Sequence, residues 1–252
     1  MSINVSSKTI ISPAFSSDNI PIVFAANDGF CPYLSVMIQS ILEHASSKRN
    51  YDILILHRDI SEWNESKFYA MIETHPNISI RLLNVSELIA GYSFYTQNRT
   101  DFTIDAYFRL MIPYILSDEY TKAIYLDGDM VVTTDVAELY ETDVSGYLLA
   151  SSRDMCGIAA YYDPKDSRKK YREEVLKITN PDDYFISGMM VMNLEKFRKQ
   201  YTLDFILKFA TSKNWMQHDQ DVLNILCNDG KAKMLHASWD VLELYKPEVL
   251  PV

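Results

Sequence analysis

The stretch that decides the fold is Ile22-Val23-Phe24-Ala25-Ala26-Asn27-Asp28-Gly29. An unbroken apolar run after Pro21 is typical of a central strand, and the polar residues behind it mark the loop in which that strand ends. The next apolar residues repeat at the spacing of one helix face, which predicts an amphipathic helix directly after the loop. These residues are Leu34, Met37, Ile38, Ile41 and Leu42.

The alternation of strands and helices continues along the first 85 residues. Residues 53–56 fit a second buried strand, and Ser61, followed by Glu62 and Glu65, fits the N-cap of a second helix. Residues 78–82 alternate between apolar and polar, as a third strand does. This order predicts an α/β fold with a mostly parallel central sheet, right-handed crossovers and helices on both faces.

Further elements are expected beyond this half. A helix over 105–115 is predicted to end near Pro113, because proline lacks the amide that a helix interior needs. The charged stretch 163–177 is predicted to be a solvated loop and helix. No linker is visible, so residues 20–252 are expected to form a single domain behind a disordered or extended leader, residues 1–19. Strands are predicted at 148–152 and 189–192, and helices around 203–210 and 222–226.

Two acids interrupt an apolar run at Ala123-Ile124-Tyr125-Leu126-Asp127-Gly128-Asp129-Met130-Val131-Val132. In an extended chain residues i and i+2 point to the same side, so Asp127 and Asp129 are expected to converge on one spot. Converging carboxylates suit Mn²⁺ or Mg²⁺, and Gly128 leaves room for a ligand beside the backbone. Because apolar residues resume at once, residues 130–132 are expected to be buried. The alternative is that Asp-Gly-Asp is only a turn that closes the strand.

The composition restricts the partners of such a site. The 252 residues are 48% apolar, enough for a full core, and carry a formal charge of -10. Nucleic acid is an unsuitable partner, because the 24 Lys and Arg are scattered rather than gathered on a basic face. Three cysteines without a CxxC pair indicate a reducing compartment. With no signal peptide pattern and no membrane-spanning stretch in the sequence, we expect a cytoplasmic protein.

The seven glycines form neither a GxGxxG motif nor a Walker-type loop. Two common ways of holding nucleotide phosphates with a glycine-rich loop are therefore missing. If the chain binds a nucleotide, we expect a metal to hold the phosphates.

Five motifs follow one another along the chain. They are FAANDGF at 24–30, AYFRL at 106–110, YLDGD at 125–129, YFISG at 184–188 with MNL at 192–194, and HDQDVLN at 218–224. In their order and approximate spacing they resemble glycosyltransferase family 8, the retaining GT-A group that includes lipopolysaccharide galactosyl- and glucosyltransferases and resembles glycogenin. Five ordered motifs, over roughly residues 20 to 245, are far more specific than any one alone.

The resemblance implies a GT-A fold with a Rossmann-like nucleotide-binding topology and a UDP-hexose donor bound through Mn²⁺ or Mg²⁺. The hexose would pass to an acceptor hydroxyl with its anomeric configuration retained. Asp127 and Asp129, the DxD motif, would ligate the metal. The uridine pocket would be lined by Ala26, Asn27, Asp28 and Phe30, with the Phe30 ring stacked on uracil and Gly128 beside the nucleotide.

On the sugar side, the resemblance implies that Ser187 and Gly188 present backbone to the hexose. Arg109 would reach toward the sugar and the phosphates, where its fork of donors suits oxyanions. Asp154 and Asp219 would contact the transferred sugar, and Gln220 would lie near the anomeric carbon.

Three of these residues also have a plain structural interpretation. Arg109 could be a surface helix residue in an ion pair, Asp219 a helix N-cap, and Phe30 a core side chain.

Several features depart from the family. Asn27 stands where the family has an acid, and Gly29 and Ile186 stand where it has Asn, which predicts weaker uridine or sugar contacts. The third protein ligand of the family's metal is a His in a C-terminal segment that we do not find before Val252. We therefore expect the chain to lack that segment.

Without that ligand, the alternative function is a sugar-nucleotide-binding domain with weak or no transferase activity. The sequence leaves open whether the acceptor is a glycan, a lipid-linked sugar or a protein. It also leaves open glucose against galactose as the donor sugar, peripheral membrane association and the oligomeric state.

Overall fold

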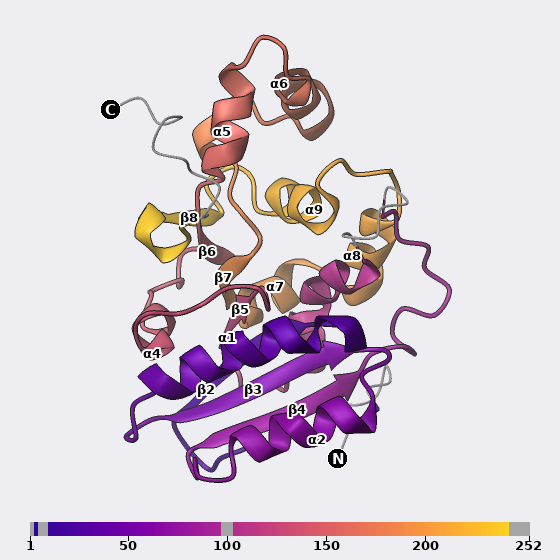
Figure 1. Ribbon diagram of the computed structural model, residues 1–252. Coiled ribbons are helices and arrows are strands. Elements are labelled where there is room, and N and C mark those ends of the chain that lie inside the picture. Colours follow the sequence, from indigo (N-terminus) through magenta and orange to yellow (C-terminus); the bar gives the residue numbers. More distant parts are fainter. Residues whose placement is uncertain (1–2, 5–9, 97–102, 242–252) are drawn as a thin grey trace.

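A computed structural model describes residues 3–4, 10–96 and 103–241 (Figure 1). Within these residues the fold is built on an eight-stranded sheet in the order β1-β4-β3-β2-β5-β7-β6-β8. The strands are β1 Ile3–Asn4, β2 Asn19–Ala25, β3 Asn50–His57, β4 Ile78–Asn84, β5 Lys122–Leu126, β6 Leu149–Ser152, β7 Met189–Asn193 and β8 Ala232–Leu235.

The sheet is mostly parallel, as the sequence predicts. Strands β1, β4, β3, β2 and β5 pair in parallel, and β6 pairs in parallel with β8. Among the described strands, β7 alone runs the other way, because it pairs antiparallel with both β5 and β6. The chain therefore belongs to the α/β class, and β2, β3 and β4 pair in parallel as expected.

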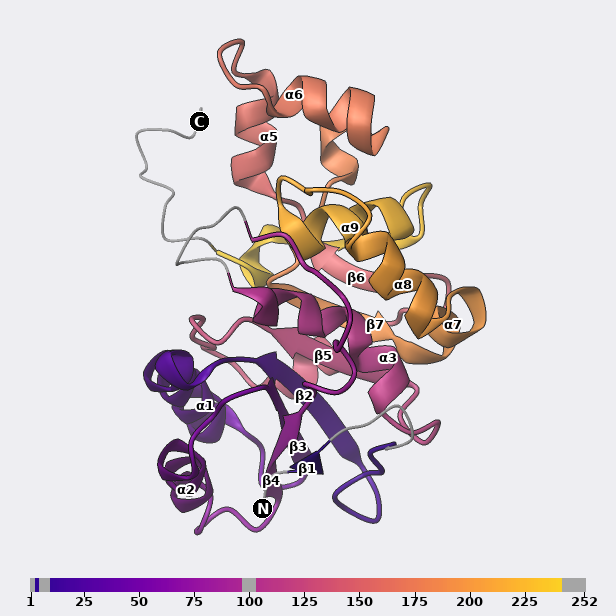
Figure 2. The ribbon, with the colours of Figure 1, turned by 90° about the vertical axis from the view of Figure 1, so that its right-hand side faces the viewer.

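Helices cover both faces of the sheet (Figure 2). Helices α1 and α2 pack on one face of β2 to β4, and α3, α7, α8 and α9 lie on the other side. The α-helices are α1 Cys31–His44, α2 Glu62–Met71, α3 Ile112–Ile115, α4 Val136–Tyr140, α5 Met155–Tyr162, α6 Arg168–Tyr171, α7 Leu194–Gln200, α8 Leu203–Ala210 and α9 His218–Leu226. Shorter turns are the 3-10 helices η1 Asp28–Phe30, η2 Ile104–Met111, η4 Pro181–Asp183 and η5 Ala237–Trp239, and the π-helix η3 Arg172–Leu176.

Alternate residues of each central strand enter different cores. Phe24 and Ile124 pack under α1, whereas Val23 and Tyr125 point to the core on the opposite face. This is the period of two expected of strands covered on both sides. It sets which face the side chain of Tyr125 takes, next to the acids that follow β5.

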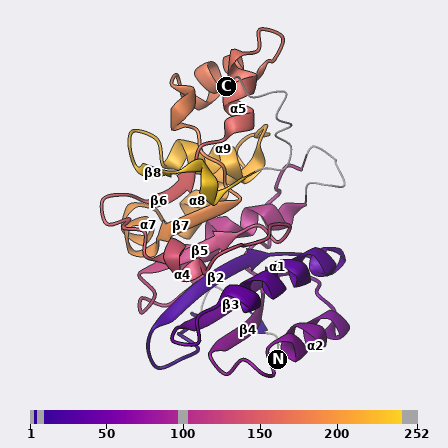
Figure 3. The same ribbon diagram turned by 60° about the vertical axis from the view of Figure 1, so that its left-hand side comes forward.

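Segment 154–183, between β6 and β7, stands apart from the half of the fold that contains β2 to β4. Figures 1 and 3 show α5 at the end of the molecule opposite to α2 and β4. The predicted solvated helix is present here as α6, but the segment is not wholly solvated, because Arg172 and Leu176 are both buried.

Two further expectations need correction. Pro113 lies in the first turn of α3, after η2, so it begins a helix instead of ending one. An amide in a first helical turn has no intrahelical partner, so proline loses nothing there. Residues 130–132 are not buried as expected: β5 ends at Leu126, the chain leaves the sheet, and Val131 is 61% exposed.

The structure describes part of the expected leader, residues 3–4 and 10–19, while residues 1–2 and 5–9 lie outside the described residues. Strand β1 extends the sheet beside β4. Ile11 is buried, and its amide donates to the carbonyl of Ile115 at 2.8 Å. The described part of this segment therefore packs against the sheet, and residues 14–17 form a bend within it.

Candidate active site

The candidate site lies where β2 and β5 end side by side. The two strands are parallel neighbours, so the loops that follow them share one edge of the sheet. A cavity of about 600 Å³ opens at this edge, and both acids of the DxD motif line it. Its remaining lining consists of Leu126, residues 130–134, Val136, Leu139, Ile186, Gly188, Met189 and residues 238–241.

Asp127 and Asp129 face the same cavity but differ in their surroundings. The amide of Asp127 donates to the Gly188 carbonyl at 2.7 Å, which fixes the backbone where the chain leaves β5. Asp129 is more exposed. Loss of water around its carboxyl group and the nearby charge of Asp127 raise the pKa of Asp129.

Arg109 is buried at the centre of the site. Its Nη2 donates to Oδ1 of Asp127 at 2.9 Å, and its Nε lies 3.1 Å from Oδ2 of Asp219. Its Nη1 donates to the carbonyl of Ser187 at 2.6 Å, and its guanidinium lies 4.3 Å above the ring of Tyr125. Arg109 is thus neither exposed nor in a surface ion pair, and it joins the DxD motif to the motifs of β7 and α9.

Gly188 allows Asp127 to lie against the chain that enters β7. A Cβ at position 188 would be 2.7 Å from Oδ2 of Asp127, closer than real contacts permit. Gly128 is similarly enclosed, because a Cβ there would lie 3.1 Å from Cε1 of Phe30. Small residues at these two positions therefore keep the acids and the first loop close together.

Asp219 is buried in α9 and is not the N-cap of that helix, a position held by Gln217. Its carboxylate accepts a hydrogen bond from Ser187 Oγ at 2.9 Å and pairs with Arg109. Burial raises the pKa of Asp219 to about 6, even though Arg109 opposes the shift. Asp221, two positions on, points elsewhere and accepts hydrogen bonds from Tyr171 and Tyr184.

Gln220 bridges two parts of the site through both ends of its amide. Its Oε1 accepts from the amide of Ser187 at 3.1 Å, and its Nε2 donates to Oδ2 of Asp154 at 3.2 Å. Asp154 is buried after β6, and its Oδ1 also caps α5 by accepting from the amide of Gly157 at 2.8 Å. The structure therefore joins the predicted residues of β6, β7 and α9 in one hydrogen-bonded network.

The predicted uridine residues lie in the loop after β2. Ala26 is buried, while Asn27 accepts from the amide of Phe30 and donates to Asp105 at 3.2 Å. The Phe30 ring is half-buried and packs against Tyr33 at a centroid distance of 5.3 Å. One part of this ring contacts the core of α1, and another lies next to Gly128.

The carboxylate of Asp28 is hydrogen-bonded to residues at the start of α2. Its Oδ1 accepts from the amide and hydroxyl of Ser61 at 2.8 and 2.7 Å and from the side-chain amide of Asn64 at 2.8 Å. These bonds lower the pKa of Asp28 and tie the loop to the start of α2. Ser61 is also the N-cap of α2, as the sequence predicts.

Two further residues belong to the site by position, although the sequence patterns do not single them out. Tyr125 donates its hydroxyl to Oδ1 of Asp127 at 3.0 Å. Asp240 lines the cavity, and burial together with the charges of Asp127 and Asp154 raises its pKa to about 6. The alternation of β5 could have indicated Tyr125, which shares the side of the strand with Asp127.

The donor set suits a hard divalent cation. Oδ1 of Asp127 is held by Arg109 and Tyr125, while Oδ2 lies against Gly188, where only a glycine leaves space. The described residues contain no group of three His, Cys, Asp or Glu arranged to hold a metal. Two carboxylates fit Mn²⁺ or Mg²⁺ only if oxygens of a ligand or water complete the coordination.

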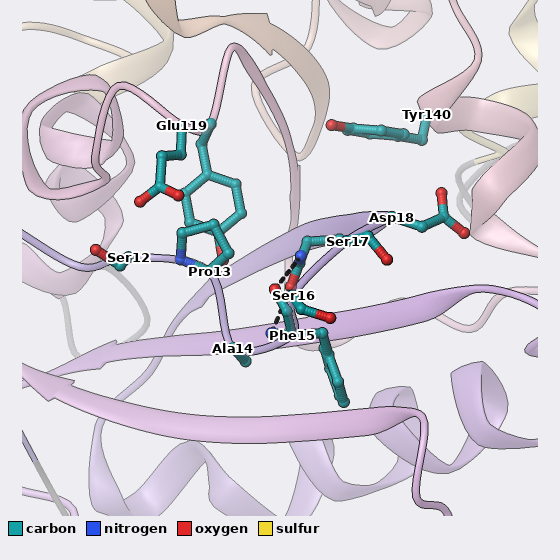
Figure 4. Close-up of a pocket in the computed structure, with 11 residues that line it drawn as sticks. Ser12, Pro13, Ala14, Phe15, Ser16, Ser17, Asp18, Glu119 and Tyr140 are labelled. Atoms are coloured by element: carbon teal, nitrogen blue, oxygen red, sulfur yellow. Dashed lines mark hydrogen bonds between the residues drawn. The ribbon is translucent and has the colours of Figure 1, made fainter.

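A second cavity, of about 510 Å³, is drawn in Figure 4. Neither acid of the DxD motif lines it. Residues 12–19 line it together with Glu119, Tyr120 and Tyr140, so it borders the starts of β2 and β5 and not their ends. Its loop is bonded to itself, because Asn19 Nδ2 donates to the Phe15 carbonyl at 2.7 Å. This cavity has no part in the site.

Comparisons with known proteins show the family and the fold of the chain. The sequence model of Glycosyl transferase family 8 matches residues 21–249. General stress protein A of Bacillus subtilis (strain 168) is 25% identical over 239 residues, which are 91% of this chain and 78% of that protein.

Two solved structures are also similar. The apo structure of the bifunctional glycosyltransferase WbbM has a TM-score of 0.81 at 26% identity, over 91% of this chain and 40% of that one. The galactosyltransferase LgtC, in complex with donor and acceptor sugar analogues, has a TM-score of 0.69 at 25% identity, over 86% of this chain and 74% of that one. The chain thus spans less than half the length of WbbM. None of the helices in the described residues is long and apolar enough to cross a membrane.

Proposed function

The chain belongs to glycosyltransferase family 8, has a GT-A fold and is a glycosyltransferase, and on this premise we propose that it transfers a hexose from a UDP-sugar to an acceptor hydroxyl with retention of configuration. The observation that carries the proposal is that Asp127, Asp129 and Gly188 line one cavity, while buried Arg109 donates to Asp127 from behind it. Carboxylates with a cation and an arginine are the groups that a sugar diphosphate needs.

In this proposal Asp127 and Asp129 would hold Mn²⁺ or Mg²⁺ beside the donor diphosphate. When bound, the metal would supply positive charge to stabilise the departing UDP anion. The protein would contribute two side chains to its coordination. An acidic chain of charge -10 binds an anionic donor only where the local field is reversed, and the metal with Arg109 provides that reversal.

The nucleoside is assigned to the loop after β2, with uracil stacked on the exposed part of the Phe30 ring. Asn27 and the backbone around Ala26 supply polar contacts. We assign Asp28 a supporting role in this pocket, since its carboxylate is occupied by Ser61 and Asn64.

The sugar is assigned to the network of Ser187, Asp219, Gln220 and Asp154. Retention needs either a protein nucleophile or attack by the acceptor on the face that UDP leaves. Gln220 is a poor nucleophile, and Asp219 is held in an ion pair with Arg109. We therefore favour same-face attack with the donor phosphate as the base, a hypothesis that a covalent glycosyl-enzyme at Asp154 or Asp219 would overturn.

We infer the location of the chain from its cysteines and the class of its product from a relative. We infer a reducing, cytoplasmic location from cysteine usage, since Cys31, Cys156 and Cys227 are all free thiols. The lipopolysaccharide glucosyltransferase of Escherichia coli (strain K12) is among the relatives, which supports a cell-surface glycan as the final product.

The experiment that tests the proposal is release of UDP from UDP-glucose or UDP-galactose, with and without Mn²⁺, in the wild type and in Asp129→Asn. Metal-dependent release that disappears in Asp129→Asn supports a transferase, because slow donor hydrolysis accompanies such activity even without an acceptor. Tight UDP-sugar binding without release, in the presence of candidate acceptors, would support the sugar-nucleotide-binding alternative. Failure to bind any UDP-sugar would refute both.

A further inference from the structure

Arg172 is a buried arginine in the segment between β6 and β7, at a position that neither the sequence motifs nor the proposed function uses. It belongs to the π-helix η3, and only 2% of its surface is exposed. Its Nη2 donates to Oδ2 of Asp154 at 3.2 Å, and its guanidinium lies 3.7 Å above the ring of Tyr184. Within the part of the chain that the structure describes, its Nη1 is buried without a hydrogen-bond partner.

Asp154 is the point at which Arg172 meets the proposed sugar site. The same Oδ2 that accepts from Arg172 also accepts from Nε2 of Gln220 at 3.2 Å. The other end of the Gln220 amide is fixed by the backbone of Ser187. A change at Arg172 is therefore two hydrogen bonds away from the residue that we place near the anomeric carbon.

Gly157 keeps this contact possible. A Cβ at position 157 would lie 2.0 Å from Nη2 of Arg172 and 2.3 Å from Oδ2 of Asp154, so no other residue leaves the pair in place. The amide of Gly157 meanwhile donates to Oδ1 of Asp154. Arg172 thus donates to Oδ2 of Asp154, and the backbone of Gly157 donates to Oδ1.

Arg172 also compensates the charge of Asp154. The Asp154 carboxylate is buried and forms an ion pair with the Arg172 guanidinium at 3.2 Å. Without the guanidinium this buried carboxylate would lose its cationic partner, and such a group turns toward water. That movement would release Gln220.

We propose that Arg172 is a positioning residue that orients and neutralises Asp154 and, through it, holds Gln220 toward the transferred sugar. The inference rests on the proposed transferase function and deepens it. Arg172 acts through Asp154 and needs no contact with the substrate. Residues that support directly acting groups in this way typically change activity by about 10- to 100-fold when they are replaced.

The test compares Arg172→Gln, Arg172→Lys, Asp154→Asn and the double variant Asp154→Asn/Arg172→Gln in UDP release from the UDP-hexose that the wild type uses. We expect kcat to fall about 10- to 100-fold in Arg172→Gln and less in Arg172→Lys, which keeps the positive charge. The double variant should lose no more than Asp154→Asn alone, because residues in one chain of contacts are not additive. The Kd of UDP with Mn²⁺, measured by calorimetry, should stay unchanged, since UDP lacks the sugar.

The matched control is Lys170→Gln, which removes a positive charge from an exposed side chain of α6. It should keep wild-type kcat.

Gly157→Ala gives a second route to the same defect if Arg172→Gln does not fold, and it should also lower kcat at constant Kd for UDP. Wild-type kcat in a folded Arg172→Gln, independent losses in the double variant, or a parallel loss of UDP binding would each overturn the inference. An inactive wild type would instead refute the proposed function.

Discussion

Nη2 of Arg109 donates to Oδ1 of Asp127 at 2.9 Å, and this ion pair joins the helical segment η2 to the end of strand β5. Only 6% of the arginine side chain is exposed, against 37% of the aspartate side chain. The pair therefore reaches from the interior to the cavity wall. It holds Oδ1 of Asp127 toward the interior, while Oδ2 lies against the backbone of Gly188.

Removal of either acid should abolish metal-dependent activity, but with different effects on folding. We expect Asp129→Asn to lower kcat/KM by more than about 100-fold, above the loss typical of a residue that only supports a metal ligand. The melting temperature should barely change, because Asp129 is exposed. Asp127→Asn should also lower the melting temperature, since it weakens the pair with buried Arg109. Asp118→Asn, at the other end of β5 and 97% exposed, is the control.

Substitution of Gly188 should act on the same acid without changing any charge. In Gly188→Ala the new Cβ would collide with Oδ2 of Asp127, so we expect weaker binding of Mn²⁺ and UDP, by about tenfold or more. Calorimetric titration with UDP at fixed Mn²⁺ measures the change. Gly146→Ala, which places its Cβ in open space, should bind UDP like the wild type. Equal affinity in the two variants would show that Asp127 Oδ2 is not used.

The ring of Phe30 should set affinity for the base. Phe30→Ala is expected to cost about 1 to 3 kcal/mol in UDP binding, the usual contribution of a stacked aromatic side chain. Phe30→Tyr should keep most of the affinity. Trp63→Ala removes a 71% exposed ring on α2 and serves as the control. If Phe30→Ala lowered the melting temperature and left the Kd of UDP unchanged, the ring would be a core residue only.

The buried carboxyl of Asp219 should make the stability of the metal-free protein depend on pH. Its pKa is raised to about 6 in the folded state, from about 3.9 in an unfolded chain. Between these values the folded state binds more protons, so this group lowers the free energy of unfolding as the pH rises from about 4 to 6. Asp219→Asn should lack that contribution. Thermal melting of both proteins across this range gives the comparison, and identical slopes would contradict it.

The first half of the fold could be predicted because its signals are local. The apolar run at 22–26, the helical spacing behind it and the Ser61 cap each depend on neighbours in sequence. The antiparallel direction of β7 could not be predicted in this way. It depends on the path of segment 154–183, and an apolar strand has the same pattern in either direction.

The residues of the candidate site could be predicted as a set of motifs. The hydrogen bonds and ion pairs between these motifs could not. The spacing of Asp127 and Asp129 indicated a shared target, and both line one cavity. The prediction that residues 130–132 are buried was wrong because it equated hydrophobicity with burial, whereas Val131 is exposed. Arg172 could not be predicted as a site residue, because it stands in a run of charged residues. Only the tertiary structure shows that its side chain turns inward to Asp154.

The central claim is that two carboxylates and a divalent cation hold the donor diphosphate, and calorimetric titration with UDP tests it most directly. The titration is made with Mn²⁺, with EDTA, and with Mn²⁺ on Asp129→Asn. The account predicts binding at one site per chain with Mn²⁺, and a loss of affinity of at least about tenfold both on chelation and in the variant. Equal affinity for UDP under all three conditions would contradict it.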